Sequence, residues 1–351
     1  MSMSTGSGSF AASLPKVHLH CHLEGSLRAQ TFLELIGRYG YPTRFRPGKE
    51  FAGEEHERAK TVDEAYRFDD FNEFLMLFAA VSRALKEPED YARLAREFVE
   101  DALAQRVVYG ELFISPSVWT FFHPDLDVRA ALDGIDRELK HAQPAATFRL
   151  IVDVTRNFGA DSAMRTAQQA VTFTDASVIG IGLGGDEARF PAELFKDVYA
   201  FARSQGLHTV VHAGEAAGAQ SVRAAVEVLG AERIGHGVRA LEDPAVVQLL
   251  AERRIPLEIC PTSNFLTGAA SREKPHPLLE LDEAGAIVTI DADDPTLFGT
   301  SITNEYEYVE RLAGREALAR FVNQAADVSF LEPEAKRALR ARLSAELLTA
   351  Q

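Results

Sequence analysis

Short apolar runs that resemble buried strands recur eight times along this chain, with helical patterns between them. The runs are rich in Val, Ile and Leu, and several are continuously apolar, as in strands covered on both faces. Strand-helix alternation repeated eight times predicts an α/β fold, a (β/α)8 TIM barrel of parallel strands. The expected strands are residues 17–21, 107–115, 148–154, 178–183, 208–212, 233–236, 255–260 and 287–291, and the clearest helical patterns are residues 91–104, 161–169, 192–205, 221–229 and 244–253.

The interval between the first two runs is the longest, and it predicts a helical insertion after the first strand. Residues 67–85 are rich in aromatic side chains at helical spacing, so we expect an amphipathic helix that packs on the barrel or forms a lid over an apolar pocket. Beyond residue 315 the pattern indicates closing helices, broken at Leu331-Glu332-Pro333. We expect residues 1–13, rich in Ser and Gly, to form a mobile tail, and residues 14–351 to form one domain.

Composition narrows the classes of partner. The 351 residues carry a net charge of −15, which argues against nucleic acid and anionic membranes as partners. No apolar run reaches the roughly 20 residues that a membrane-spanning helix needs. Two cysteines, Cys21 and Cys260, cannot form a disulfide framework, and the start of the chain lacks the features of a signal peptide. We therefore expect a cytoplasmic protein that acts on a small molecule.

Histidine and carboxylate side chains stand at or just after four of the eight runs. His20 and His22 end the first run, and their imidazoles point to the same side of an extended strand. His212 ends the fifth run, His236 ends the sixth, and Asp293-Asp294 follows the eighth. Because the carboxyl ends of barrel strands surround one mouth, these groups are expected to converge. Imidazole and carboxylate are ligands that zinc prefers, so the pattern predicts a hydrolytic metal site.

From Leu14 to about Leu347, the chain resembles the adenosine deaminase family of metal-dependent amidohydrolases. The resemblance rests on the order and spacing of several motifs rather than on any one of them. They are Pro15-Lys16-Val17-His18-Leu19-His20-Cys21-His22-Leu23-Glu24-Gly25, Gly184-Gly185-Asp186-Glu187, His212-Ala213-Gly214-Glu215, Arg233-Ile234-Gly235-His236-Gly237, Cys260-Pro261-Thr262-Ser263-Asn264 and Asp293-Asp294-Pro295.

The resemblance implies a metal centre and a reaction. One Zn²⁺ per chain would be bound by His20, His22, His212 and Asp293, although iron, cobalt or manganese can occupy such sites. The zinc would lower the pKa of a bound water towards about 7, and the resulting hydroxide would attack C6 of a 6-aminopurine. Ammonia would leave, so the chain is expected to be a hydrolase of purine metabolism.

The resemblance also implies roles around the substrate. Glu215 would protonate purine N1, a task typically worth roughly 10²–10⁴-fold in rate. His236 would accept a proton from the water or orient the hydroxide. Asp294 would hydrogen-bond N7, and the Gly185 amide would reach N3. Glu24 would lie near the 5′ end of the ribose.

Each of these residues also has a structural alternative. His236 could be a histidine with satisfied hydrogen bonds at a strand end, Glu215 could cap the following helix, and Asp294 before Pro295 could be a helix N-cap. His18 is assigned a structural role. Five further histidines belong to no motif and are assigned to the surface or to packing: His56, His123, His141, His208 and His276.

The substrate is less constrained than the reaction. The residues from Leu257 to Gly268 resemble the nucleoside branch of the family, which favours adenosine or deoxyadenosine, converted to inosine or deoxyinosine. Glu24, however, stands where adenosine deaminases typically have aspartate. This change could mark a 5′-modified nucleoside such as 6-aminodeoxyfutalosine of menaquinone synthesis, which is the alternative substrate, with free adenine as a third.

Overall fold

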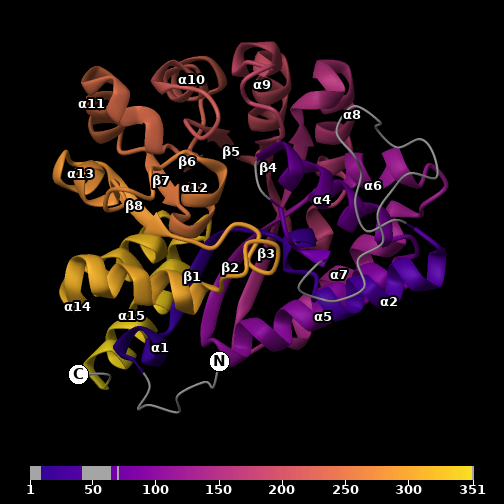
Figure 1. The fold of residues 1–351 in the computed structure, drawn as a ribbon, viewed down its shortest axis with the longest axis horizontal. Coiled ribbons are helices and arrows are strands. Elements are labelled where there is room, and N and C mark those ends of the chain that lie inside the picture. The colour runs from indigo at the N-terminus through magenta and orange to yellow at the C-terminus, as the bar shows by residue number, and fades with distance from the viewer. Residues whose placement is uncertain (1–8, 42–64, 69–70, 350–351) are drawn as a thin grey trace.

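The computed structural model of the chain describes residues 9–41, 65–68 and 71–349. Its eight strands form one parallel sheet in the order β1 to β8, curled into the barrel of Figure 1. The barrel expected from the eight apolar runs is confirmed, and the strand ends differ from the predicted ones by at most a residue or two. The strands are β1 (Lys16–His22), β2 (Val107–Ile114), β3 (Thr147–Thr155), β4 (Val178–Gly184), β5 (His208–Ala213), β6 (Arg233–His236), β7 (Pro256–Ile259) and β8 (Ile287–Ile290).

The barrel is closed where the chain leaves β8 and passes beside β1. Cys21 and Asp293 form a parallel bridge there. The amide of His22 donates to the carbonyl of Asp293 at 2.9 Å, and the amide of Asp293 donates to the carbonyl of His20 at 3.0 Å. The closing backbone contacts therefore place Asp293 between two histidines of β1.

Helices surround the strands in Figure 1, as buried parallel strands require. Some of them begin with a side-chain cap or a proline: Asp127 accepts from the amide of Ala130, and Asp243 precedes a proline at the first helical position. The helices are α1 (Phe10–Ser13), α2 (Ala29–Tyr39), α4 (Phe71–Ala84), α5 (Pro88–Ala104), α6 (Pro116–Phe122), α7 (Val128–His141), α8 (Gly159–Val171), α9 (Lys196–Ser204), α10 (Ala219–Ala224), α11 (Pro244–Arg253), α12 (Pro261–Thr267), α13 (Leu278–Glu283), α14 (Ile302–Val328) and α15 (Pro333–Thr349).

The insertion after β1 contributes α2 and α4, and α4 packs against α6 and α2. The aromatic-rich segment is helical over α4, as its spacing predicts, although residues 69–70 of that segment lie outside the described part of the chain. Phe74 is buried and stacks on Phe298 with ring centroids 4.6 Å apart. Helix α4 is thus anchored to the loop after β8, beside the mouth of the barrel.

The two chain ends pack on the same side of the barrel. Residues 9–13 differ from the tail expected over 1–13: Phe10 and Ala11 are buried in α1, which lies against α14. The amide of Ala11 donates to Glu310 at 2.9 Å and the hydroxyl of Ser9 donates to Glu307 at 2.6 Å, so an apolar anchor and these hydrogen bonds hold the turn against α14. The expected break at Leu331-Glu332-Pro333 separates α14 from α15. Within the described residues, no helix has the length and apolar character needed to cross a membrane.

A buried ion network connects the strands beneath the mouth. Arg233 of β6 contacts Glu111 of β2, and its Nε donates to Glu258 of β7 at 2.5 Å; all three side chains are almost fully buried. The guanidinium also lies over the Phe330 ring, 3.6 Å from its centroid. Because two buried carboxylates share this cation, removing the cation leaves both uncompensated.

We therefore expect Arg233→Met to lower the free energy of unfolding by about 3–5 kcal/mol, since it strands two buried carboxylates. Urea unfolding followed by circular dichroism measures this. The matched control is Arg129→Met, whose ion-pair partners Asp133 and Asp175 are exposed, and which should leave the free energy of unfolding nearly unchanged. Equal effects of the two substitutions would contradict the assignment of the network.

Candidate metal and substrate site

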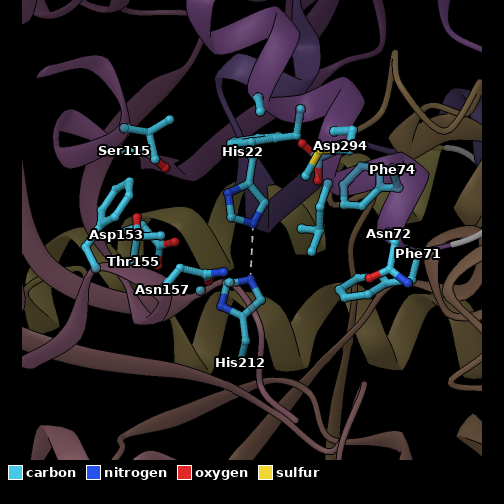
Figure 2. Close-up of a pocket in the computed structure, with 18 of the residues that line it drawn as sticks. His22, Phe71, Asn72, Phe74, Ser115, Asp153, Thr155, Asn157, His212 and Asp294 are labelled. Carbon is cyan, nitrogen blue, oxygen red and sulfur yellow. Dashed lines mark hydrogen bonds between the residues drawn. The ribbon is translucent and has the colours of Figure 1, made fainter. Parts of the chain in front are cut away.

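The predicted metal ligands meet at the carboxyl end of the barrel. His20 and His22 end β1, His212 lies near the end of β5, and Asp293 follows β8. In Figure 2, His22 and His212 point towards each other, and their Nε2 atoms are 3.1 Å apart. Asp293 Oδ1 lies 3.5 Å from Nε2 of both His20 and His22. The four residues are buried, and Asp293 lies close to both histidines of β1.

These donor atoms fit a cation. Two overlapping groups of ligand atoms each lie within 4.8 Å of one another: His20, His212, His236 and Asp293, and His22, Asp293 and Asp294. Nε2 of His20 is buried without a hydrogen-bond partner, which is costly for a polar atom unless something else binds it. A divalent cation would satisfy this lone pair and could be bound by the neighbouring imidazoles as well.

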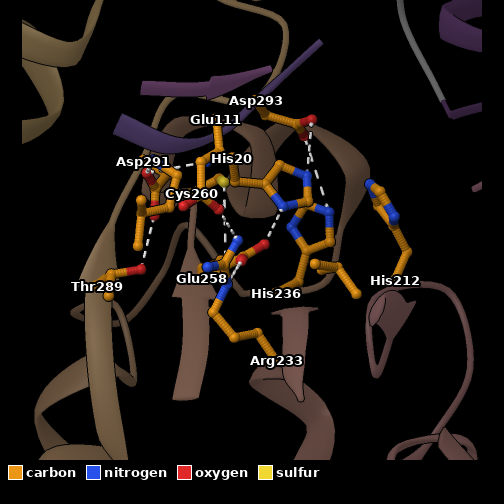
Figure 3. A network of polar contacts seen from close by, with 12 residues as sticks. His20, Glu111, His212, Arg233, His236, Glu258, Cys260, Thr289, Asp291 and Asp293 are labelled. Carbon is orange, nitrogen blue, oxygen red and sulfur yellow. Dashed lines mark hydrogen bonds and ion pairs between the residues drawn. The ribbon is translucent and has the colours of Figure 1, made fainter. Parts of the chain in front are cut away.

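His20 is oriented by a carboxylate behind it. Its Nδ1 lies 2.7 Å from Glu258 Oε2, and Glu258 also accepts a hydrogen bond from Arg233, as Figure 3 shows. An Nδ1–H that donates to Glu258 leaves the Nε2 lone pair free for a metal, the usual second partner of a metal-bound histidine. Glu258 has no role in the sequence analysis. The available signal was a charged residue inside an otherwise apolar strand.

The backbone of Asp293 lies in the left-handed region and is held there by contacts with neighbouring residues. Its φ is +62°, uncommon for a residue with a side chain and worth about 1–3 kcal/mol of strain. The backbone contacts with β1 and a 2.6 Å hydrogen bond from the hydroxyl of Ser263 to Oδ2 hold it there. The strained backbone aims the carboxylate at the histidines.

Glu215 is positioned by a turn whose backbone amides donate to the carboxylate of Glu187. Both oxygens of Glu187 accept backbone amides, from Gly214 at 2.7 Å, Glu215 at 3.1 Å, Ala216 at 2.7 Å and Ala217 at 2.9 Å. The turn places Glu215 Oε2 3.6 Å from Nε2 of His236. Burial, together with the charges of Asp293 and Glu187, raises the pKa of Glu215 to about 8. A carboxyl group with such a pKa can donate a proton at neutral pH.

Asp294 faces the cavity beside Asp293. Burial and the adjacent Asp293 charge raise its pKa well above the usual range, and its Oδ1 has no hydrogen-bond partner. A side chain at Gly25 would place Cβ 1.9 Å from that oxygen, so a glycine is required there. No helix begins at Pro295, where the chain forms turns, so the N-cap alternative for Asp294 is not supported.

A cavity of about 560 Å³ opens in front of these residues. Asn157 and Asp153 line one side of it in Figure 2, and Phe71 and Phe74 of α4 line the opposite side. Gly185 is also among the lining residues. Gly185 has a φ of +96°, and a Cβ there would lie 2.5 Å from the side-chain oxygen of Asn157, so a glycine is required beside this side chain. Asp153 was not singled out in the sequence analysis; burial raises its pKa to about 8.

Glu24 lies behind the wall of the cavity. Its Oε1 accepts from the amide of Ser115 at 2.8 Å and from the indole of Trp119 at 2.6 Å, while Oε2 has no partner. Burial raises its pKa. Ser115 lines the cavity and Glu24 does not. Glu24 would therefore affect a substrate indirectly, by holding the segment that contains Ser115.

The histidines without motifs divide into two groups. His208, His141 and His123 lie at the surface or half-buried, as expected, and His56 lies outside the described residues. His276 is buried and hydrogen-bonds Asn264, whose amide nitrogen lies 3.0 Å from Nδ1 of His236. The assignment of His276 to the surface or to packing therefore missed a polar connection to the site.

Comparisons with known proteins agree with this geometry. A family model described as adenosine deaminase matches residues 15–346. The chain is 35% identical to an aminodeoxyfutalosine deaminase of Streptomyces avermitilis, covering 97% of this chain and 92% of the relative. It is 34% identical to an adenine deaminase of Vibrio parahaemolyticus, covering 93% and 94% of the two chains.

Solved structures show the same fold at lower identity. An adenine deaminase from Arthrobacter aurescens superposes with a TM-score of 0.84 at 28% identity, covering 95% of this chain and 98% of the other. An amidohydrolase from Burkholderia ambifaria with bound Zn has a TM-score of 0.84 at 27% identity, covering 99% and 96%. An Arabidopsis protein in complex with IMP has a TM-score of 0.81 at 26% identity, covering 97% and 99%.

Metal removal should destabilise the protein, because a ligand that binds only the folded state stabilises it by roughly 4 kcal/mol at a thousandfold excess over Kd. We expect chelation to lower the melting temperature in differential scanning calorimetry, and added Zn²⁺ to restore it. His212→Asn should abolish this metal dependence, whereas His141→Asn, an exposed control, should retain it. An unchanged metal response in His212→Asn would contradict the ligand assignment.

Glu187→Gln should lower kcat by roughly 10²-fold at nearly unchanged stability of the metal-loaded protein, because the amide group cannot accept all four backbone N–H groups that aim Glu215. Steady-state kinetics measures this. Exposed Glu193→Gln is the control, with kcat expected to stay within twofold of the unsubstituted protein. Full activity of Glu187→Gln would show that the turn does not depend on this carboxylate.

Proposed function

The chain belongs to the adenosine deaminase family, and from that membership we propose that it deaminates a 6-aminopurine nucleoside with a large 5′ substituent, 6-aminodeoxyfutalosine. Proteins of this family are hydrolases that act on C–N bonds, and this chain is one of them. Adenosine, the first substrate that the motifs predict, is supported less well, because the relatives are named aminodeoxyfutalosine or adenine deaminases.

The size of the cavity carries the proposal. Pockets of roughly 300–1,000 Å³ hold drug-sized ligands, and the cavity here measures about 560 Å³. A bare purine at Glu215 and Asp294 would fill only the inner end. The remaining volume supports a substrate that continues well beyond the base.

The walls of the outer cavity suit an aromatic extension. They carry Phe71, Phe121, Phe122 and Phe158, and the Phe121 side chain is exposed although it is large and apolar. Arg189 lies among them, 70% exposed and paired with Asp186. The 5′ extension of 6-aminodeoxyfutalosine ends in a benzoate group, whose ring would pack on phenylalanines and whose carboxylate would face the guanidinium.

At the inner end, the chain's own residues would perform the deamination. His20, His22, His212 and Asp293 would hold a divalent cation, which when bound lowers the pKa of a water and supplies a nucleophile at neutral pH. Glu215 would deliver a proton to N1 as the nucleophile attacks C6. Asp294 would hydrogen-bond N7. The Gly185 amide would face N3, and a small-molecule product with a 6-oxo group would leave together with ammonia.

Free adenine is the second candidate substrate. Relatives and one solved structure bear the name adenine deaminase, and the groups that would contact the purine ring do not depend on a ribose. The two candidates therefore differ in what fills the outer cavity rather than in the reaction at C6.

We expect kcat/KM to fall in the order 6-aminodeoxyfutalosine, adenosine, adenine, because each step removes contacts in the outer cavity. The loss of 6-aminopurine absorbance in the ultraviolet measures all three reactions with the same zinc-loaded protein. A higher kcat/KM for adenine would replace the proposed substrate with the second candidate. No turnover of any of the three would remove the proposed function.

Arg189→Met should lower kcat/KM for 6-aminodeoxyfutalosine by roughly fivefold, the value of a partly exposed ion pair, and leave adenosine unchanged. Arg137→Met, at an exposed position of α7, is the matched control for the loss of a cation. A similar loss with both substrates would mean that Arg189 acts on the fold of the loop rather than on the substrate's carboxylate.

A further inference from the structure

We propose that Asn264 and His276 fix the tautomer of His236, so that Nε2 of His236 carries a proton and this residue donates a hydrogen bond to the reacting oxygen. Glu215 is then the group that takes the proton lost by water. The inference deepens the proposed function and rests on it for the reaction, although the hydrogen-bond chain itself is independent of the substrate.

The chain of hydrogen bonds starts at a backbone amide. The N–H of Leu278 lies 3.1 Å from Nδ1 of His276, and an amide N–H can only donate. Leu278 is the first residue of α13, so its N–H has no partner within the helix. Nδ1 of His276 is therefore an acceptor, and the proton of the neutral ring is on Nε2. Burial supports the neutral form by lowering the pKa of His276 to about 3.

The proton on Nε2 of His276 determines the direction of the next hydrogen bond, to Asn264. Nε2 of His276 lies 3.2 Å from Oδ1 of Asn264, so the imidazole N–H donates to the amide oxygen. This fixes the orientation of the amide, which is otherwise ambiguous between its oxygen and nitrogen. The Asn264 NH₂ group then faces Nδ1 of His236 at 3.0 Å. All three side chains are buried, so water does not offer an alternative partner of either kind.

At His236 the chain determines which nitrogen carries the proton. Because Nδ1 accepts from Asn264, the neutral imidazole carries its proton on Nε2. That atom faces two acceptors, Glu215 Oε2 at 3.6 Å and Asp293 Oδ2 at 3.9 Å. Both ends of the ring thus favour the same tautomer. A protonated Nε2 cannot bind a metal, which separates His236 from His20, His22 and His212 even though its atoms lie close to theirs.

The tautomer assigns the proton transfers. The protonated carboxyl group of Glu215 gives its proton to N1 as the electron pair of the C6–N1 double bond moves to N1. As the water oxygen bonds to C6, one O–H bond breaks and its proton passes to the carboxylate that Glu215 has become. Glu215 returns to its starting state, and the atoms and charges balance. His236 keeps its own proton throughout and orients the attacking oxygen through Nε2–H.

The test reverses the direction of one hydrogen bond. Asn264→Asp has nearly the same shape but can only accept from both histidines, so His236 would carry its proton on Nδ1. In zinc-loaded protein labelled with ¹⁵N-histidine, long-range ¹H–¹⁵N spectra distinguish the two tautomers, and comparison with His236→Gln assigns the signal. We expect Nε2–H in the unsubstituted protein, Nδ1–H in Asn264→Asp, and a kcat lower by roughly 10²-fold with KM within threefold.

Asn304→Asp, exposed on α14, is the control for the added charge and should leave both spectrum and kcat unchanged. A proton on Nδ1 of His236 in the unsubstituted protein overturns the proposal, and so does an Asn264→Asp variant that shifts the tautomer and keeps its kcat. If Asn264→Asp does not fold, the spectrum of the unsubstituted protein decides alone. That spectrum needs no substrate, so it separates this inference from a failure of the proposed function.

Discussion

The contact between Asp293 and the end of β1 is the constraint on which the site depends. Two backbone hydrogen bonds, each close to 3 Å, close the barrel between His20, His22 and Asp293. The same bonds bring a carboxylate to within 3.5 Å of two imidazole nitrogens. The backbone contacts that close the barrel therefore also bring Asp293 to the two histidines of β1, and they hold Asp293 at its positive φ.

Buried carboxylates behind this contact orient the residues that face the cavity. Arg233 offsets Glu111 and Glu258, and Glu258 orients His20, so an ion network that joins three strands also sets the direction of a metal ligand. At the end of β5, Glu187 accepts hydrogen bonds from the backbone amides of the turn that contains Glu215. In both places a carboxylate that does not face the cavity determines where a residue that does face it will point.

Local patterns predicted much of this. The eight strands follow from apolar runs, and the register of His20 and His22 follows from the alternation of side chains along a strand. The motifs located the histidines and the carboxylates that converge at the mouth. They included Asn264 but gave it no role, and they did not indicate Glu258, Asp153 or His276, because these roles depend on contacts with other elements. His276 has no motif, and its role follows from a helix start that faces it.

By itself, the sequence determined the barrel, the places of its chemical groups at strand ends and the family to which the chain belongs, because periodicity and motif spacing are local properties that survive without coordinates. Only the tertiary structure decided which groups touch, how Asp293 is strained towards the histidines, how large the cavity is, and in which direction hydrogen bonds run from Leu278 to His236. These are relations between atoms on different elements, and packing alone brings those atoms within hydrogen-bonding distance.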